Sequence, residues 1–170
     1  IAFAGKTFMG LAKLLLGTTD YDEIVALADK GNRGNVDTQV FEVLKGDPKS
    51  PYGMYPPELP IFAFGKPADY DKALETYSKE DLAASLVALC ANNVIASTMQ
   101  AAGTLKMKKV YIGGNLFRGE VFRREVELLF QMWSGYMFFE LHYMKTGHTG
   151  AIGAMTTEPG TELDCLMQPQ

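Results

Sequence analysis

The longest helical pattern in the sequence begins at Ser78 and runs to about Ala102, and no other segment constrains the fold as strongly. Ser78 belongs to the residue types that cap helices, and Asp81 places a negative charge in the first turn, where the helix dipole favours it. Gly103 supplies a stop. The side chains expected along one stripe of this helix are Leu82, Leu86, Leu89, Asn93 and Ala96. This spacing predicts a single long helix that packs through one face.

Three shorter helical patterns precede the long one, and a glycine closes each of them. Thr19 and Asp20 offer N-terminal caps for the second pattern. The expected ranges are residues 7–16 closed by Gly17, 21–30 closed by Gly31, and 35–45 closed by Gly46. The first part of the chain is therefore predicted to be helical.

Residues 46–70 interrupt the helical patterns. They are rich in proline, which breaks helices, and they read as a long surface loop. Within them, residues 60–64 (PIFAF) are too apolar for a bare loop. We expect these five residues to dock on the chain's own core or on a partner chain.

Strand-like and helical patterns alternate after the long helix. Residues 110–112 (VYI) predict a short strand, 119–132 a helix, 136–143 an aromatic-rich strand, and 149–155 a helix of small residues. The last fifteen residues read as a loose tail. The whole pattern indicates an α/β fold in which helix outweighs strand.

The composition argues against several functional classes. The net charge is −4 and no basic stripe is visible, which argues against a nucleic-acid-binding surface. No run of eighteen apolar residues occurs, so we expect no membrane span. Two cysteines, Cys90 in an apolar run and Cys165 in the polar tail, make neither a disulfide framework nor a metal site, which favours the reducing cytoplasm. Because the chain opens on Ile1 and a glycine-containing turn, we expect it to begin in the middle of a fold.

Residues 4–7 (AGKT) match the end of the P-loop motif G-x-x-x-x-G-K-[ST]. A P-loop needs a preceding strand and another glycine five residues before Gly5, and the sequence supplies neither. Two interpretations stay open. The segment is a tight turn ahead of a helix, or its backbone N–H groups and the helix N-terminus face a phosphate.

Residues 110–118 (VYIGGNLFR) place two glycines and an asparagine at the carboxy end of a strand. Ligands commonly sit at this end of strands in α/β sheets, and a flat ring can approach a glycine closely because it has no Cβ. A plain strand-to-helix turn fits these residues equally well. Arg118 would bind phosphate or pair with a carboxylate such as Glu120.

A few other residues stand out by type. Asn92 and Asn93 lie in apolar surroundings, so we expect a buried hydrogen-bonded network or a ligand contact. Trp133, the single tryptophan, either fills the core or anchors an interface. No carboxylate is an evident general base, and neither His142 nor His148 has an evident catalytic partner.

Taken in order, these segments resemble the eukaryotic-type (type II) pantothenate kinases. TFMGLAKLLLG resembles that family's GGGTFxGLxxLLTG, SKEDLA followed by Asn92 and Asn93 matches SKEDLARA…NNIG, and VYIGGNLFR resembles VxFVGNFLR. Residues 30–47 resemble the SRGD…VRDIYGGD stretch, and Phe64 with Gly65 matches SFG. Trp133 with Ser134 and GAIGA (150–154) match WSKG and GAVGA. The similarity covers residues 7–155, and the collinear set is more specific than any single motif.

The resemblance implies the carboxy-terminal half of such a kinase. Residues 1–156 would be a carboxy-terminal lobe of an acetate-and-sugar-kinase (actin-like, Hsp70-like) fold, used for nucleotide binding and dimerisation, and residues 157–170 a tail. The implied reaction is phosphorylation of the 4′-hydroxyl of pantothenate by ATP with Mg²⁺, the first step of coenzyme A biosynthesis, with feedback by acyl-CoA. The implied assembly is a homodimer or a heterodimer with a related subunit. The family's first phosphate loop, catalytic Glu and substrate-binding Arg precede the matched segment.

The resemblance also carries ligand positions over to this chain, with no catalytic residue and no metal ligand among them. The implied ATP-binding residues are Gly5, Lys6, Thr7, Gly113, Gly114, Asn115 and Arg118. Ile61 and Trp133 would belong to the pantothenate pocket or the dimer interface. The apolar residues expected to support that interface are Val121, Leu128, Leu129 and Met132.

Two departures from the family pattern matter. The three glycines before Thr7 are here Ala4, Gly5 and Lys6, and a side chain at a positive φ would cost about 1 kcal/mol. The family's HEGYFGAVGA reads KTGHTGAIGA, which replaces its His-Glu pair by Lys145 and Thr146. Two alternatives to an active kinase follow: a catalytically inactive subunit that acts as a binding or regulatory partner, and a fold fragment whose glycines are structural.

Overall fold

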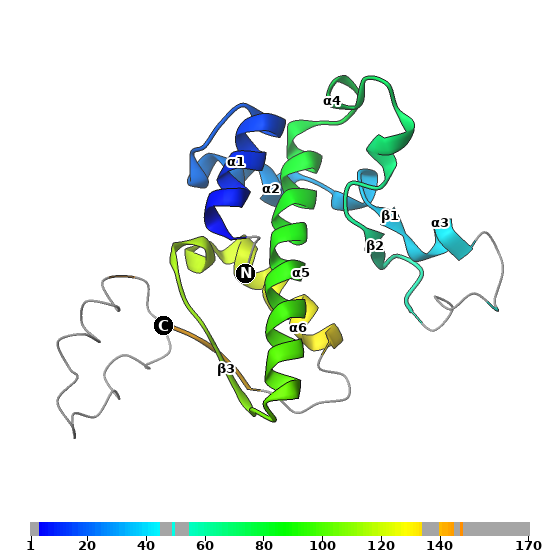
Figure 1. Cartoon of the computed structure of the whole chain (residues 1–170). Helices are drawn as coiled ribbons and strands as arrows, with labels where there is room; N and C mark the ends of the chain where they lie inside the picture. The colour runs from blue at the N-terminus through cyan, green and yellow to red at the C-terminus, as the bar shows by residue number, and fades with distance from the viewer. Residues whose placement is uncertain (1–3, 45–48, 50–54, 134–139, 145–146, 148–170) are drawn as a thin grey trace. The chain divides into compact units, whose positions relative to one another are not determined.

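A computed structural model describes residues 4–44, 49, 55–133, 140–144 and 147 (Figure 1). The chain divides into two compact units, residues 1–94 and 95–170, and the helix α5 runs from the first into the second. The described elements are helical for the most part, with two small sheets. This agrees with the predicted α/β class.

The first unit is a helical layer with a small hairpin-like sheet. Its elements are α1 (Gly5–Leu16), α2 (Tyr21–Lys30), η1 (Arg33–Asn35), β1 (Thr38–Gln39), α3 (Val40–Leu44), β2 (Pro60–Phe62), η2 (Lys66–Asp69), α4 (Ala73–Thr76) and the start of α5 (Lys79–Thr104). Figure 1 shows α1 and α2 beside the amino-terminal half of α5. The second unit contains the end of α5, β3 (Lys109–Ile112), η3 (Asn115–Arg118), α6 (Glu120–Trp133) and β4 (Glu140–Tyr143).

The predicted helix signals at the start of the chain are confirmed. Gly17 ends α1 in the left-handed conformation, with φ 84°. The Asp20 side chain caps α2 by accepting hydrogen bonds from the backbone N–H groups of Asp22 and Glu23, at 2.9 and 3.1 Å. Ser78 likewise accepts from the N–H of Asp81 at 3.1 Å, so α5 begins as expected.

The predicted helix over residues 35–45 is wrong in its first half. The chain instead makes the 3₁₀ turn η1 and the two-residue strand β1, and the helix α3 begins only at Val40. The Asn32 side chain accepts from the N–H of Gly34 at 3.0 Å, a local bond that favours a turn over a continuing α-helix. The strand β1 then pairs antiparallel with β2, which lies inside the predicted loop over residues 46–70.

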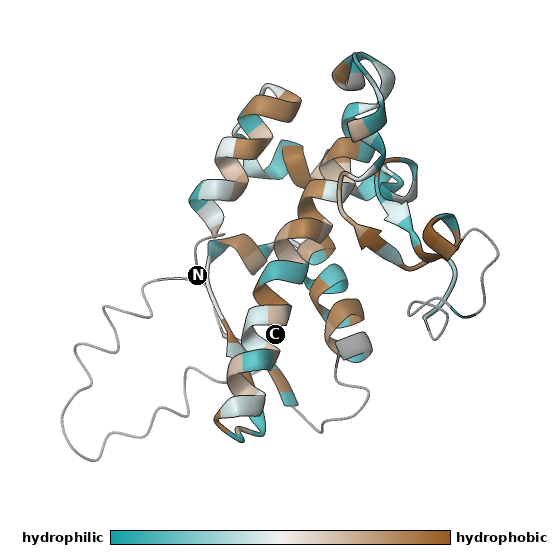
Figure 2. Cartoon of the chain, turned by 45° about the vertical axis from the view of Figure 1, so that its right-hand side comes forward, coloured by the Kyte–Doolittle hydropathy of each residue, from teal (hydrophilic) through white to brown (hydrophobic). Residues whose placement is uncertain are grey.

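The antiparallel pairing of β1 with β2 shows where residues 60–62 dock. Pro60 and Ile61 are half-buried in β2 against the chain's own β1, and the N–H of Val40 donates to the carbonyl of Leu59 at 2.9 Å. The docking is therefore within the chain at these residues. Phe62 stays 50% exposed, and Figure 2 shows β2 as an apolar segment.

In the second unit, β3 and β4 form a two-stranded parallel sheet in which Val110 lies opposite Leu141 and Ile112 opposite Tyr143. Val110 and Ile112 are buried, whereas Lys109 and Tyr111 face outward. The predicted strands are confirmed at residues 110–112 and 140–143. The rest of the second predicted strand, the helix expected over 149–155 and the tail lie outside the described residues.

The long helix α5 forms much of the core, and its burial exceeds a single stripe. Leu82 and Leu86 are buried as expected, while Leu89, Asn93 and Ala96 are only partly buried. Additional buried side chains include Ala83, Val87, Cys90, Ala91 and Ile95. Burial raises the pKa of the Cys90 thiol to about 12, as expected for a small core residue.

By length and composition alone, α5 also qualifies as a candidate membrane span, contrary to the expectation from its sequence. Of its most apolar window, 56% is buried inside the structure, and the core helix of a soluble protein passes the same test. Figure 2 shows apolar residues along α5.

Candidate functional site

The turn after β3 has a backbone that only glycine adopts readily. Gly114 has φ 115° and ψ 159°, a combination in which a Cβ would be strained. A Cβ built on Gly114 would meet no heavy atom within 4 Å, so among the described residues nothing covers the backbone there. Gly113, by contrast, packs against Met144, whose Cβ would lie 3.3 Å from an added Cβ. The turn therefore offers an open peptide surface that a flat group can approach.

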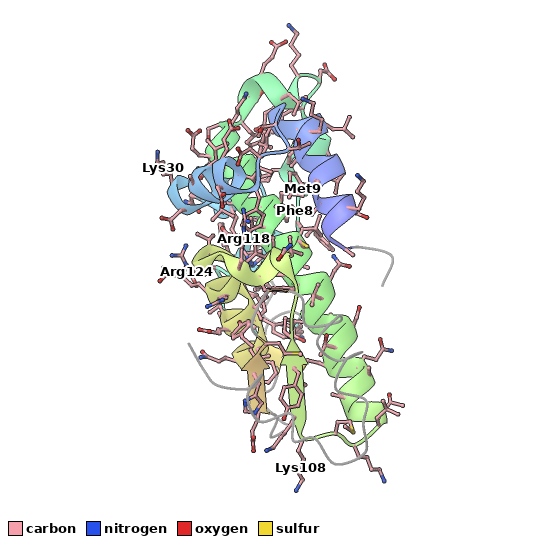
Figure 3. All side chains as sticks on the ribbon, turned by 90° about the vertical axis from the view of Figure 1, so that its left-hand side faces the viewer. Phe8, Met9, Lys30, Lys108, Arg118 and Arg124 are labelled. Atoms are coloured by element: carbon pink, nitrogen blue, oxygen red, sulfur yellow. The ribbon has the colours of Figure 1, made fainter. Side chains whose placement is uncertain are left out.

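Asn115 and Arg118 follow this turn as the first and last residues of η3. Both are exposed, and Figure 3 labels Arg118. The N–H of Phe117 donates to the carbonyl of Gly114 at 3.1 Å, which closes the turn. The structure thus brings Gly113, Gly114, Asn115 and Arg118 together in one short segment at the carboxy end of β3.

Side chains from α6 and β4 hold this segment. Arg123 donates from Nε to the carbonyl of Phe117 at 2.9 Å, and its guanidinium carbon lies 5.4 Å from the centre of the Tyr143 ring. The Tyr143 hydroxyl donates to the carbonyl of Arg123 at 3.3 Å. Neither residue was identified from the sequence; the Tyr143 contact with Arg123 joins residues 20 positions apart, and the Arg123 bond to Phe117 joins residues six positions apart.

The other predicted phosphate-facing residues open α1. Ala4 is extended, with φ −140°, and makes no side-chain cap, and the first turn contains no acidic residue. Gly5 is the first helical residue, and Lys6 and Thr7 follow it in the first turn. The tight turn expected over residues 4–7 is therefore mostly helix. Because Gly5 and Lys6 lie in the helix and Ala4 is extended, the penalty considered for a positive φ does not arise there.

A buried carboxylate, which sequence reasoning did not single out, organises the β1–β2 region. Asp37 is 1% exposed and its Oδ1 accepts hydrogen bonds from the Ser85 hydroxyl and, at 3.1 Å, from the N–H of Phe64. Arg33 Nε lies 3.6 Å from the other carboxylate oxygen. Burial raises the pKa of the Asp37 carboxyl above its ordinary value, although the Ser85 hydrogen bond, the Phe64 N–H and the charge of Arg33 oppose the shift.

The predicted pocket and interface residues have mixed outcomes. Ile61 lies half-buried in β2, and Trp133 ends α6, with its side chain outside the described parts of the structure. Val121 and Leu129, which were expected to support the interface, are buried within the chain. Leu128 is 49% exposed.

Of the paired amides, Asn93 is partly buried and makes a hydrogen bond inside its own helix. Its Nδ2 donates to the carbonyl of Leu89 at 2.9 Å, a bond within α5. His142 is exposed and stacks on Tyr111, with ring centres 5.1 Å apart. Across the described ranges, no group of three or more His, Cys, Asp or Glu residues could hold a metal ion.

Three curated relatives match most of this chain. Pantothenate kinase 1 of Arabidopsis thaliana is 29% identical over 157 residues, which cover 92% of this chain and 41% of the relative. Pantothenate kinase 1 of Oryza sativa subsp. japonica is 30% identical, over 89% of this chain and 23% of the relative. The 4′-phosphopantetheine phosphatase of Mus musculus is 32% identical, over 90% of this chain and 18% of the relative. The chain therefore spans less than half the length of each of these three relatives.

The family comparison covers nearly the whole chain and includes both units. The model of the Fumble family matches residues 2–157, a range that contains the opening of α1, the β1–β2 region and the β3–η3 turn. The chain therefore belongs to the Fumble family of pantothenate-kinase-like proteins.

Proposed function

We propose that this chain is part of an ATP-dependent pantothenate kinase that forms 4′-phosphopantothenate, the first step of coenzyme A biosynthesis. The structural observation that carries the proposal is the open, glycine-only backbone at Gly114, at the carboxy end of a parallel strand. That is the place where α/β sheets commonly bind ligands. Family membership and the pantothenate kinase names of two relatives supply the substrate.

The turn would take the adenosine part of ATP. A purine ring is flat and can lie against the peptide planes of Gly113 and Gly114, because no described residue comes within 4 Å of a Cβ built on Gly114. Asn115 offers an amide that can both donate and accept, which suits a nucleoside edge. Arg118 supplies a positive charge at the end of the same segment.

The first turn of α1 would face phosphate. A helix N-terminus presents backbone N–H groups and the positive end of the dipole, and in the described part of α1 no side chain caps the helix and the first turn contains no acidic residue. Lys6, exposed in that turn, adds a positive charge beside Gly5 and Thr7. The bound ATP, with Mg²⁺, would supply the γ-phosphoryl group. We derive no metal ligand from this chain.

The remaining expectations belong to the same proposal. The chain would form the carboxy-terminal lobe of an acetate-and-sugar-kinase fold, in a cytoplasmic dimer that acyl-CoA inhibits. Ile61 and Trp133 would contribute to the pantothenate pocket or the dimer interface. What supports Ile61 in this role is its partial exposure on a strand whose neighbour Phe62 is also exposed.

A second candidate is a catalytically inactive subunit that binds or regulates a related kinase. It is favoured by the sequence departures at Ala4, Lys6, Lys145 and Thr146. The similarity to a mouse protein named 4′-phosphopantetheine phosphatase also shows that this family occurs in proteins named for a different reaction. The two candidates share the nucleotide-binding turn and differ in catalysis.

The Gly114→Val variant tests the nucleotide-binding turn. A β-branched side chain at φ 115° strains the backbone and fills the open space, so the affinity for ATP should fall about tenfold or more, which corresponds to about 1.4 kcal/mol. Titration calorimetry of the purified chain with Mg·ATP measures the change. Gly17→Val is the matched control, because Gly17 also has a positive φ and open surroundings but closes α1 instead.

Loss of affinity in the Gly114 variant alone supports the proposal. If Gly114→Val binds ATP as tightly as the parent while both proteins stay folded by circular dichroism, the turn is structural and the proposed adenosine site is wrong.

A further inference from the structure

We propose that Arg123, backed by Tyr143, is the positioning residue that fixes the nucleotide-binding turn of the second unit. The inference rests on the proposed function, since it assigns Arg123 to the segment that would contact adenosine. All of the residues involved lie within the second unit, on β3, η3, α6 and β4.

Arg123 reaches the turn from the first part of α6. Its Nε donates to the carbonyl of Phe117 at 2.9 Å, and the N–H of Phe117 itself closes the turn by donating to Gly114. Arg123 therefore holds the peptide unit that directly follows the one whose N–H bonds to Gly114. A hydrogen bond from a charged donor to a half-buried carbonyl is stronger than one between neutral groups.

Tyr143 fixes the orientation of Arg123. The guanidinium lies over the Tyr143 ring, with 5.4 Å between its central carbon and the ring centre, and the Tyr143 hydroxyl donates to the carbonyl of Arg123 at 3.3 Å. Burial, with a smaller contribution from the charge of Glu127, raises the pKa of the Tyr143 hydroxyl, so it stays a neutral donor at physiological pH.

The same strand also supports the other side of the turn. Tyr143 is paired with Ile112, the last residue of β3, and the N–H of Met144 donates to the carbonyl of Ile112 at 2.8 Å. The Met144 side chain packs on Gly113. The turn is thus held at Gly113 by β4 and at Phe117 by Arg123, and Gly114 lies between the two supports with its outer face open.

This arrangement predicts that Arg123 shapes the site without touching the nucleotide. Replacing Arg123 would leave every residue proposed to contact the nucleotide unchanged, but the Phe117 carbonyl would lose its hydrogen bond from Arg123. Arg124, its neighbour on α6, is exposed and serves as the matched control (Figure 3).

The test compares Arg123→Gln, Arg123→Lys and Arg124→Gln in the purified chain. Calorimetry with Mg·ATP measures affinity, hydrogen exchange by NMR measures protection of the Phe117 amide, and thermal unfolding measures stability. We expect Arg123→Gln to weaken ATP binding about tenfold, to speed exchange at Phe117, and to reduce the ATP-induced shifts of the Gly113 and Gly114 amides even at saturation. Arg123→Lys should recover part of the affinity, because its ammonium keeps a charged donor for the carbonyl, whereas the Gln amide is a neutral one. Arg124→Gln should bind within twofold of the parent.

The outcomes separate the two proposals. If the parent chain binds ATP and Arg123→Gln binds it equally well with unchanged amide shifts, the positioning role is overturned while the proposed function stands. If the parent chain does not bind ATP, the proposed adenosine site fails. In that case the hydrogen-exchange rate of the Phe117 amide alone tests the role of Arg123. If Arg123→Gln leaves the protection of this amide unchanged, Arg123 does not hold the turn.

Discussion

Asp37 shows how one buried side chain can set the path of a segment far away in the sequence. It lies 27 residues from Phe64 and 48 from Ser85, and it accepts a hydrogen bond from each. Phe64 has φ 55°, unfavourable for a bulky residue, and its N–H bond to Asp37 helps to maintain that conformation. The carboxylate thus ties the strand β2 and the turn after it to the first turns of α5.

Replacing Asp37 should be destabilising to a degree that depends on what replaces it. Asp37→Ala leaves the buried Phe64 N–H and Ser85 hydroxyl without their acceptor, and we expect a loss of about 2–4 kcal/mol of unfolding free energy. Asp37→Asn keeps an acceptor oxygen and should lose less. Urea unfolding of both variants measures the difference, and equal losses would contradict the role of the oxygen as acceptor.

The contribution of Asp37 to the unfolding free energy depends on pH, and the direction of its pKa shift gives the sign of that dependence. Since the pKa of Asp37 is raised in the folded state, the folded protein holds this proton more tightly than the unfolded chain, and ionisation of the carboxyl opposes folding. Stability from Asp37 is therefore greatest below the unfolded pKa near 4 and declines as the pH rises through the raised folded pKa. As the pH rises from the unfolded pKa to the raised folded pKa of Asp37, the unfolding free energy of the parent should fall relative to that of Asp37→Asn. A parent that gains stability there would show that the charges of Arg33 and Lys66 outweigh burial.

At the scale of elements, Gly31 brings the end of α2 into close backbone contact with the start of α5. A Cβ on Gly31 would overlap the carbonyl group of Glu80 and lie 2.9 Å from the N of Asp81. Next to it, Asp81 accepts from the N–H of Asn32 at 2.7 Å and from the Asn35 side chain at 3.0 Å. The absence of a Cβ lets the two backbones meet and lets Asp81 hold the following turn.

Gly31→Ala should therefore separate these two elements. The added methyl meets rigid backbone, so we expect a loss of about 1–3 kcal/mol of unfolding free energy together with weaker protection of the Asn32 amide. Gly10→Ala is the control, since Gly10 lies inside α1 with nothing within 4 Å of an added Cβ. That variant should gain about 0.5–1 kcal/mol from helix propensity. Thermal or urea unfolding of Gly31→Ala and Gly10→Ala measures the change in unfolding free energy of each variant. Similar changes in the two variants would rule out the backbone clash at Gly31.

The elements also show what could be predicted from the sequence. Helices with local signals were predicted well: the Asp20 cap, the Gly17 stop and the Ser78 cap all act within a few residues. The turn at Gly113 and Gly114 was likewise predicted, because two glycines directly follow a strand-like run, and Gly114 does have a positive φ. The helix expected over residues 35–45 failed because Asn32, Asp37 and β2 impose a turn and a strand there through local and distant bonds. Arg123 and Tyr143 were missed for the same reason.

At the scale of the whole molecule, family membership and the geometry of the β3–η3 turn answer different questions. The first says which family the chain belongs to, and the second bears on nucleotide binding. The match over residues 2–157 gives the family, and the chain covers 41% of one pantothenate kinase and 23% of another. The geometry at Gly114 concerns binding alone, and phosphoryl transfer needs more than a bound nucleotide. It needs positioned Mg·ATP and a group that orients or deprotonates the attacking hydroxyl.

The 170-residue chain should therefore bind ATP without phosphorylating pantothenate. The resemblance to the type II pantothenate kinases implies that the catalytic Glu and the first phosphate loop precede the segment that this chain matches. The measurement is 4′-phosphopantothenate formation by mass spectrometry, with Mg·ATP and pantothenate, beside calorimetry of ATP binding. A pantothenate kinase from Arabidopsis thaliana serves as the positive control. If this chain forms product above the enzyme-free background, and Gly114→Val abolishes that product, the prediction is wrong and the chain is a complete kinase. ATP binding without product, both in this chain and in any longer protein that contains it, would favour the inactive subunit.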